Sequence, residues 1–238
     1  MPDTSATHAN TLFCFGFGDT ARHLAARLKA RGWTARGTRR AALKPGMTVF
    51  DGQGPASGLD LDGVGAALVS IPPGEEGDPV LRWHLEDLRQ AGGLRWVGYL
   101  SSTGVYGNHD GGWVDETASC HPSSPRARAR LEAENAWLAS GLPVRVFRLA
   151  GIYGPGRNAL EDVRAGRARR LHKPGQVFSR VHVEDIARVL EASIVQQGPP
   201  EPVLPVLPVL NVADMEPSPP AAPVEYACQL LGAPWPPL

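Results

Sequence analysis

The chain has 238 residues, of which 42% are hydrophobic and 20% charged, as is ordinary for a globular protein with one large domain. Its 24 basic and 24 acidic residues cancel, so we expect neither nucleic acid nor a membrane surface as partner. Three scattered cysteines match no metal-ligand spacing and no disulfide framework. No signal peptide and no apolar run of roughly 20 residues is present, so the sequence predicts a soluble, cytoplasmic protein without a metal site.

Strands and helices are predicted to alternate along the first two thirds of the chain. Short apolar runs predict strands at 12–15, 34–40, 47–50, 66–71, 95–101 and 143–149. Helical spacing and stop signals predict helices from the turn after residue 15 to Gly32, from Pro79 to Ala91 and from Ser124 to Ser140. This alternation is typical of an α/β fold of the Rossmann type, a doubly wound parallel sheet whose strands end along one edge.

The last third of the chain is less regular. A loop follows Gly151, a helix is predicted over 183–195, and a proline-rich stretch is interpreted as a linker that leads into a strand. A last helix is predicted over 224–231. We therefore expect a Rossmann domain at 10–155 and a small C-terminal lobe at 156–238, within the same structural unit.

A glycine-rich turn follows the first predicted strand. Its residues, Gly16, Phe17, Gly18, Asp19, Thr20 and Ala21, fit the pattern G-x-G-x-x-G/A of dinucleotide-binding turns. The first glycine permits the tight turn, the second lets a pyrophosphate approach the backbone, and the small last residue lets helix and strand pack closely. Such turns are common, and the alternative is an ordinary loop, but the flanking strand and helix favour a dinucleotide site.

The end of the second predicted strand distinguishes between cofactors. An NAD site usually has Asp or Glu there, which accepts a hydrogen bond from the ribose 2′-hydroxyl. This chain has Arg39 and Arg40 instead. Two guanidinium groups suit a 2′-phosphate, so the sequence favours NADP(H), with NAD(H) as the second choice. The alternative is a solvated basic loop.

Four further motifs occur in a fixed order along the chain: YLSSTGVYG (Tyr99–Gly107), WVDE (Trp113–Glu116), FRLAGIYGPGR (Phe147–Arg157) and VHVEDIA (Val181–Ala187). With the glycine turn, they resemble the extended and atypical short-chain dehydrogenases/reductases, the NAD-dependent epimerase/dehydratase family. The resemblance implies an NAD(P)-binding Rossmann domain, a C-terminal substrate-side lobe, and hydride exchange on a small-molecule substrate, often a nucleotide-linked sugar. It also implies a homodimer that forms through a pair of helices.

The resemblance also suggests site residues. Ser102 matches the family's catalytic hydroxyl, and the neighbouring Thr103 is a candidate to share its role. Ser70 and Ser101, at two strand ends, are expected to contact the cofactor, and Tyr106 the substrate. The alternative is that these hydroxyls satisfy backbone groups at strand ends.

The family's catalytic tyrosine, followed four residues later by lysine, is missing. None of the four tyrosines has lysine at that distance, and sliding the pattern along the chain places Arg126 and Arg130 at the two positions. Arginine does not deprotonate in proteins, so it is no proton shuttle. We expect Arg130 to contact the cofactor and Arg126 an anionic substrate group; the alternative is a helix surface on which Glu134 pairs with Arg130.

Several other groups are candidates near the expected cleft. Asp115 and Glu116 would serve as acid or base if burial raised their pKa. Arg157 and Asn158 follow the last Rossmann strand and are candidates for substrate contacts. The sequence therefore favours an atypical NAD(P)-dependent oxidoreductase or epimerase-like enzyme. A non-catalytic NADP(H)-binding sensor, or a scaffold with a vestigial site, remains the alternative.

Overall fold

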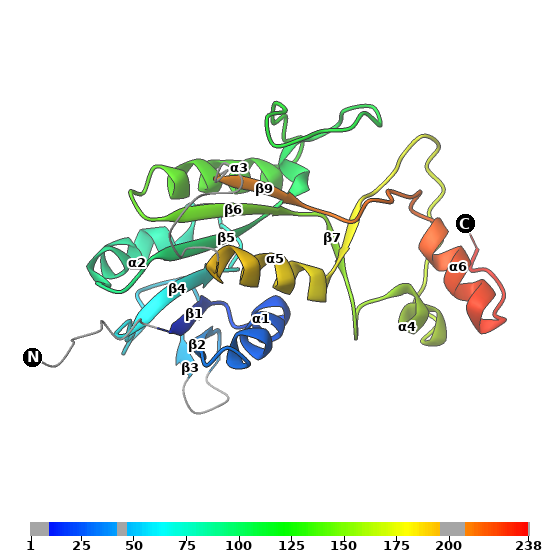
Figure 1. Ribbon diagram of the computed structural model, residues 1–238. Coiled ribbons are helices and arrows are strands. Elements are labelled where there is room, and N and C mark those ends of the chain that lie inside the picture. Colours follow the sequence, from blue (N-terminus) through cyan, green and yellow to red (C-terminus); the bar gives the residue numbers. More distant parts are fainter. Residues whose placement is uncertain (1–9, 42–46, 196–207, 238) are drawn as a thin grey trace, which may run out of the picture.

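A seven-stranded sheet, parallel throughout, forms the centre of the molecule (Figure 1). The computed structural model describes residues 10–41, 47–195 and 208–237. In spatial order the strands are β3 (Met47–Val49), β2 (Thr34–Arg39), β1 (Thr11–Phe15), β4 (Val64–Val69), β5 (Trp96–Ser102), β6 (Val144–Leu149) and β9 (Val209–Val212). The order reverses between β1 and β4, as in a doubly wound sheet. The predicted α/β fold of the Rossmann type is therefore confirmed.

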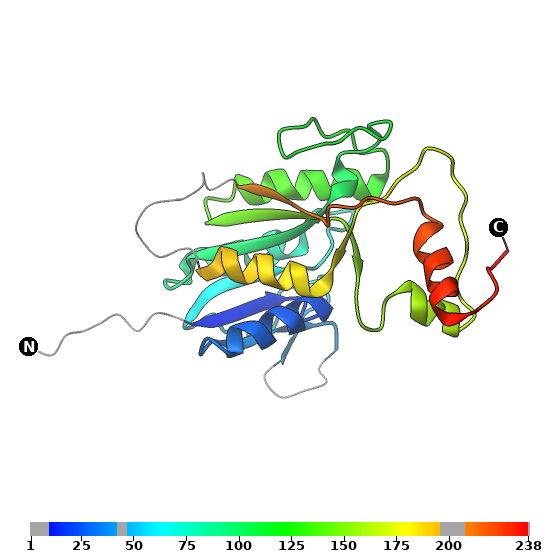
Figure 2. The same ribbon diagram turned by 45° about the vertical axis from the view of Figure 1, so that its right-hand side comes forward.

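Helices cover both faces of the sheet, and each pair encloses its own apolar core. On one face lie α1 (Asp19–Lys29) and α5 (Val183–Val195), whose leucines and isoleucines join a buried cluster with β1 and β4. On the other face lie α2 (Pro79–Gln90) and α3 (Pro125–Leu138), whose Val80, Leu88 and Trp137 join a second cluster. Figure 2 shows the two layers with the sheet between them. Strands that are buried on both faces have continuous apolar sequences, and this pattern allowed their prediction from the sequence.

A small lobe lies beyond the carboxyl ends of β5 and β6 (Figures 1 and 2). It is formed by the parallel pair β7 (Gly151–Tyr153) and β8 (Arg180–His182) and by the helices α4 (Ala159–Arg164) and α6 (Ala222–Leu231). The segment 156–238 supplies the lobe except for β7, and it also supplies α5 and β9 to the main domain. The sequence did not predict β7, β8 or α4, because elements of three to six residues carry too little periodicity.

The predicted linker lies largely outside the described residues, but the strand that it leads into is present as β9. Within the described parts of the chain, no helix is long and apolar enough to span a bilayer. The cytoplasmic location stays a prediction.

Candidate functional site

The glycine turn between β1 and α1 is held by the neighbouring strands. Gly16 has a φ of +88°, and its N–H donates to Thr38 Oγ1 at 3.0 Å, while Phe17 N–H donates to the Thr38 carbonyl at 2.8 Å. A Cβ on Gly16 would lie 2.6 Å from Ser70 Oγ, so only glycine fits this position without a shift. The turn is therefore fixed by a buried threonine on β2 that the sequence analysis did not single out.

Ser70 supports the turn from the other side. Its hydroxyl, at the carboxyl end of β4, donates to the Gly16 carbonyl at 2.7 Å. Some side chains of the turn itself pack against the core, and others face solvent. Phe17 packs against the core and Ala21 is buried, whereas Asp19 is exposed and accepts a hydrogen bond from Arg22 at 2.8 Å. The expected cofactor contacts in this turn are thus backbone groups rather than side chains.

The N-terminus of α1 has the properties of an anion site. Side chains cap the N-termini of three other helices, since Asp78, Ser124 and Asn158 accept from backbone N–H groups of α2, α3 and α4. The N-cap residue of α1 is Gly18, and no side chain caps this helix. A Cβ at Gly18 would meet nothing nearer than 4.0 Å, so the space in front of the helix is open. A dinucleotide's pyrophosphate fits this arrangement of free N–H groups and helix dipole.

Arg39 and Arg40 lie where β2 ends, beside the turn. Arg39 is half-buried and Arg40 is exposed. Among the described residues, neither guanidinium has a hydrogen-bond or ion-pair partner. Both are therefore available to a ligand, as a 2′-phosphate contact requires.

A hollow of about 540 Å³ lies beside the carboxyl end of β3. Its volume is within the range of small-molecule sites, roughly 300–1,000 Å³. The register pairs Arg39 with Val49 of this hollow. The remaining lining residues are Met47, Thr48, Phe50, Asp51, Gly54, Pro55, Ser57 and Gly58. The loop from Asp51 to Gly58 is thus a candidate contact surface that the sequence analysis missed, because its glycines and prolines indicate only a loop.

The hydroxyls at the end of β5 differ in their surroundings. Ser102 is half-buried, and its Oγ accepts a hydrogen bond from Gly104 N–H at 3.2 Å, where it caps the 3-10 helix η1 (Thr103–Val105). Thr103 Oγ1 lies 3.5 Å from the Leu149 carbonyl. Ser101 is buried and donates to Glu134, and its contact with a cofactor stays a prediction.

The two arginines at the positions of the missing tyrosine and lysine have different roles in the fold. Arg130 is half-buried, and its Nη1 donates to the Leu100 carbonyl at 2.7 Å and lies 3.4 Å from the Tyr99 hydroxyl. Arg126 is exposed at the start of α3. The alternative in which Glu134 pairs with Arg130 on the helix surface is wrong, because Glu134 is only 1% exposed and points toward β6.

The true partner of Glu134 is Arg148 on β6. Their charged groups approach to 2.8 Å, and both are buried. Arg148 also donates to the Tyr106 hydroxyl at 2.9 Å, and that hydroxyl donates to Asn211 Oδ1 on β9 at 2.8 Å. Tyr106 is 2% exposed and its hydroxyl contacts protein groups, so its contact with a substrate stays a prediction. The arginine within the apolar run VRVFRL was the one sequence signal of this cluster.

The remaining candidates also have structural partners. Asp115 is exposed, and hydrogen bonds from Thr117 lower its pKa, so the condition for an acid–base role, a pKa raised by burial, is not met. Glu116 accepts from Asn211 N–H at 2.7 Å and so occupies the free edge of β9. Asn158 caps α4 and also donates to the Gly154 carbonyl at 2.9 Å. Of this group, only Arg157 is exposed without a side-chain partner in the described parts of the chain.

No three histidine, cysteine, aspartate or glutamate side chains among the described residues are arranged to hold a metal ion. The carboxyl edge of the sheet therefore offers an open helix N-terminus, two arginines without partners among the described residues, and the Ser102 hydroxyl as candidate ligand-binding groups.

Comparison with known proteins places the chain among proteins of this fold. No family model matches it. It is 31% identical over 191 residues to protein YeeZ of Escherichia coli K12, covering 72% of this chain and 68% of YeeZ. A conserved protein of unknown function from Silicibacter pomeroyi has a solved structure that is 46% identical to this chain. It superposes with a TM-score of 0.82 over 96% of this chain and 80% of its own.

More distant solved structures share the fold. MoeE5, solved with UDP-glucose and NAD, is 24% identical, with a TM-score of 0.71 over 95% of this chain and 84% of its own. The dTDP-glucose 4,6-dehydratase of Bacillus anthracis, solved with NAD, is 17% identical, with a TM-score of 0.69 over 94% and 82%. The chain therefore belongs to the same family as protein YeeZ, and its fold is that of the NAD-dependent epimerase/dehydratase enzymes of the short-chain dehydrogenase/reductase type.

Proposed function

We propose that this protein binds a nicotinamide dinucleotide at the carboxyl edge of its sheet and is an atypical oxidoreductase or epimerase-like enzyme. Its substrate would be a sugar nucleotide or another small polar metabolite. The observation that carries the proposal is the uncapped N-terminus of α1 behind a glycine turn that Thr38 and Ser70 fix in place. The NAD complexes of MoeE5 and of the dehydratase, which share this fold, support it.

NADP(H) is the favoured cofactor. The backbone N–H groups at Gly18 and along the first turn of α1 would hold the pyrophosphate. Arg39 and Arg40 would hold the 2′-phosphate, since both are free of partners among the described residues. The side chains at the end of β2 include no carboxylate that would repel this phosphate.

The groups at the end of β5 would act on the substrate. A bound nicotinamide supplies hydride exchange. The Ser102 hydroxyl accepts from Gly104 N–H, and its own proton is left to donate to a substrate oxygen. Arg130, fixed by the Leu100 carbonyl, would orient an anionic or polar group of the substrate.

A second candidate function is a non-catalytic NADP(H)-binding sensor. It is favoured by the two arginines at the positions where the family has its proton-transferring tyrosine and its lysine. It is also favoured by Tyr106, whose hydroxyl is used inside the fold.

Replacement of both arginines tests the choice of cofactor. In an Arg39→Ala, Arg40→Ala variant, we expect the affinity for NADPH to fall by about 10- to 100-fold, because two charge-assisted hydrogen bonds are lost. The affinity for NADH should be nearly unchanged. Titration of nicotinamide fluorescence measures both, with Arg128→Ala on exposed α3 as the control. An equal loss of NADH affinity would contradict the 2′-phosphate assignment.

Replacement of Ser102 tests catalysis. We expect Ser102→Ala to lower the rate of hydride transfer with an active sugar nucleotide by roughly 100-fold, as removal of a positioned hydroxyl does. The affinity for NADPH should not change, since the side chain is assigned to the substrate. Rates come from nicotinamide absorbance across a panel of sugar nucleotides. Equal rates in both proteins would remove this role, and wild-type binding without any turnover would favour the sensor.

A further inference from the structure

The charges of this neutral chain are unevenly distributed. Residues 157–180, which form part of the lobe, contain seven of the 24 arginines and lysines but only two acidic residues. Residues 51–90 have the opposite bias, with eight acidic residues and two arginines. A net charge of zero therefore hides a strongly basic segment, which we call the basic segment 157–180.

Four cations of the basic segment are exposed and have no hydrogen-bond or ion-pair partner for their side chains within the described residues: Arg157, Arg164, Arg169 and Lys173. Two others are partly neutralised, because Arg167 pairs with Asp162 at 3.1 Å and Arg170 approaches Glu225 to 3.7 Å. The segment thus presents several uncompensated positive charges to solvent.

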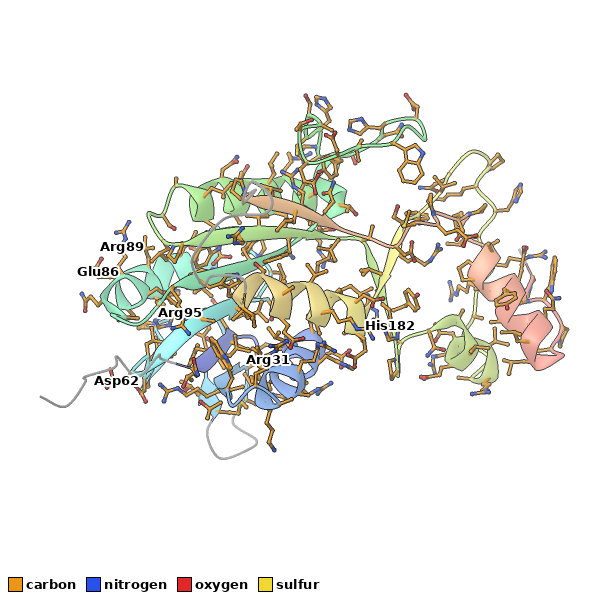
Figure 3. All side chains as sticks on the ribbon, viewed as in Figure 1. Arg31, Asp62, Glu86, Arg89, Arg95 and His182 are labelled. Carbon is orange, nitrogen blue, oxygen red and sulfur yellow. The ribbon has the colours of Figure 1, made fainter. Side chains whose placement is uncertain are left out.

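These charges lie at the functional end of the molecule. The basic segment leaves the sheet with β7 and returns with β8, so it stands beyond the carboxyl edge where the glycine turn opens (Figure 1). Asp62 and Glu86 lie at the opposite end, together with Arg89 and Arg95, as Figure 3 shows, so the charges at that end are mixed.

Two of the acidic groups near the edge are paired with arginines. Asp19 pairs with Arg22 at 2.8 Å, and Glu76 pairs with Arg82. Exposed charges act over a Debye length of about 8 Å at physiological ionic strength and about 30 Å at 0.01 M salt. At low salt the positive charge of the lobe consequently acts over a longer distance than at physiological salt.

We propose that the basic segment 157–180 steers the polyanionic dinucleotide to the carboxyl edge and raises its association rate without contacting it in the bound state. This proposal depends on the proposed dinucleotide binding. Steering of a charged ligand by a local field accelerates association by roughly 10- to 1,000-fold and falls with ionic strength. NADPH should respond more than NADH, because its 2′-phosphate adds about 1.5 to 2 negative charges.

Charge reversal in the lobe tests the proposal. Arg169→Glu is compared with Lys29→Glu, which changes the net charge equally. Lys29 is exposed at the end of α1, a helix that runs away from the carboxyl edge. Stopped-flow nicotinamide fluorescence gives the association and dissociation rate constants of NADPH at about 10 and 500 mM salt. Far-UV circular dichroism checks that both variants fold.

We expect Arg169→Glu to lower the association rate constant at least about threefold at low salt, and Arg164→Glu with Arg169→Glu to lower it further. The dissociation rate constant should stay constant, the difference should vanish at high salt, and Lys29→Glu should have a much smaller effect. Unchanged association, or an equal effect of Lys29→Glu, would overturn steering by the lobe. Faster dissociation would overturn the claim of no contact, whereas absence of any NADPH signal in the wild-type protein would overturn the proposed function itself.

Discussion

The two ends of the carboxyl edge differ in whether their polar groups have partners within the protein. Where β1 and β2 end, the helix N-terminus is uncapped, and Arg39 and Arg40 have no partners among the described residues. Where β5 and β6 end, most polar groups are tied to one another: Ser101 and Arg148 to Glu134, and Tyr106 to Arg148 and Asn211. The first end is open to a ligand, and the second is largely satisfied within the protein.

Polar groups at one end are therefore available for binding, whereas those at the other end maintain the shape of the fold. A polar group with good partners inside the fold contributes to stability, and redirecting it to a ligand costs the free energy of the lost contacts. A group without partners has no such cost. The β1–β2 end is therefore prepared for an anion, whereas the buried cluster at the β5–β6 end sets the spacing of three strands and α3. Ser102 and Arg130 are intermediate, because each makes a hydrogen bond within the protein and each is only half-buried.

The largest expected effect comes from breaking the buried cluster. Glu134→Gln leaves the Arg148 guanidinium buried without its countercharge, so we expect the free energy of unfolding to fall by about 3–5 kcal/mol. Glu132→Gln, an exposed change of the same kind on the same helix, should alter it by less than about 0.5 kcal/mol. Urea unfolding followed by circular dichroism measures both. Similar values for the two variants would show that the cluster is not what holds this end of the edge.

The same contrast explains what the sequence could and could not predict. The glycine turn was predictable because all its determinants are local: an apolar strand, two glycines and a helix. The cluster was not, because it joins α3 to β6 and β9, whose relative placement no local pattern contains. Because Arg130 and Glu134 are four residues apart, the helical spacing places both on one face of α3. Only the packing of α3 on the sheet shows that Arg130 reaches β5 while Glu134 pairs with Arg148.

A smaller effect is expected from a change in the turn at the open end. Gly16→Ala places a side chain at positive φ and against Ser70 Oγ, so we expect a loss of about 2–3 kcal/mol in unfolding free energy and weaker NADPH binding. Gly32→Ala is the matched control, since Gly32 also has positive φ but meets no atom within 4 Å. It should cost about 1–2 kcal/mol and leave binding unchanged. If Gly16→Ala bound NADPH like the wild type, the turn would not be the phosphate site.

The smallest effect concerns the contact that holds α1, and with it the open helix end, against α5. Glu191 on α5 is 7% exposed and pairs with Arg27 at 2.6 Å and Arg31 at 2.5 Å on α1. The hydrogen bond from Arg31 is the main cause of the lowered pKa of Glu191, and burial opposes it. A lowered folded-state pKa stabilises the protein above the unfolded value, about 4.3, and this gain is lost as pH falls through the folded value.

Glu191→Gln should therefore lower the free energy of unfolding by about 1–2 kcal/mol at pH 7, because two charged hydrogen bonds are weakened. The difference from the wild type should shrink as pH falls below the unfolded value and through the lowered folded-state pKa of Glu191, where the wild-type carboxylate becomes protonated. Urea unfolding at a series of pH values measures this difference. Glu225→Gln on α6 in the lobe, whose longer contact with Arg170 is 3.7 Å, is the control and should show little pH-dependent difference. A constant difference from pH 7 to pH 3 would mean that packing, rather than the ion pairs, joins α1 to α5.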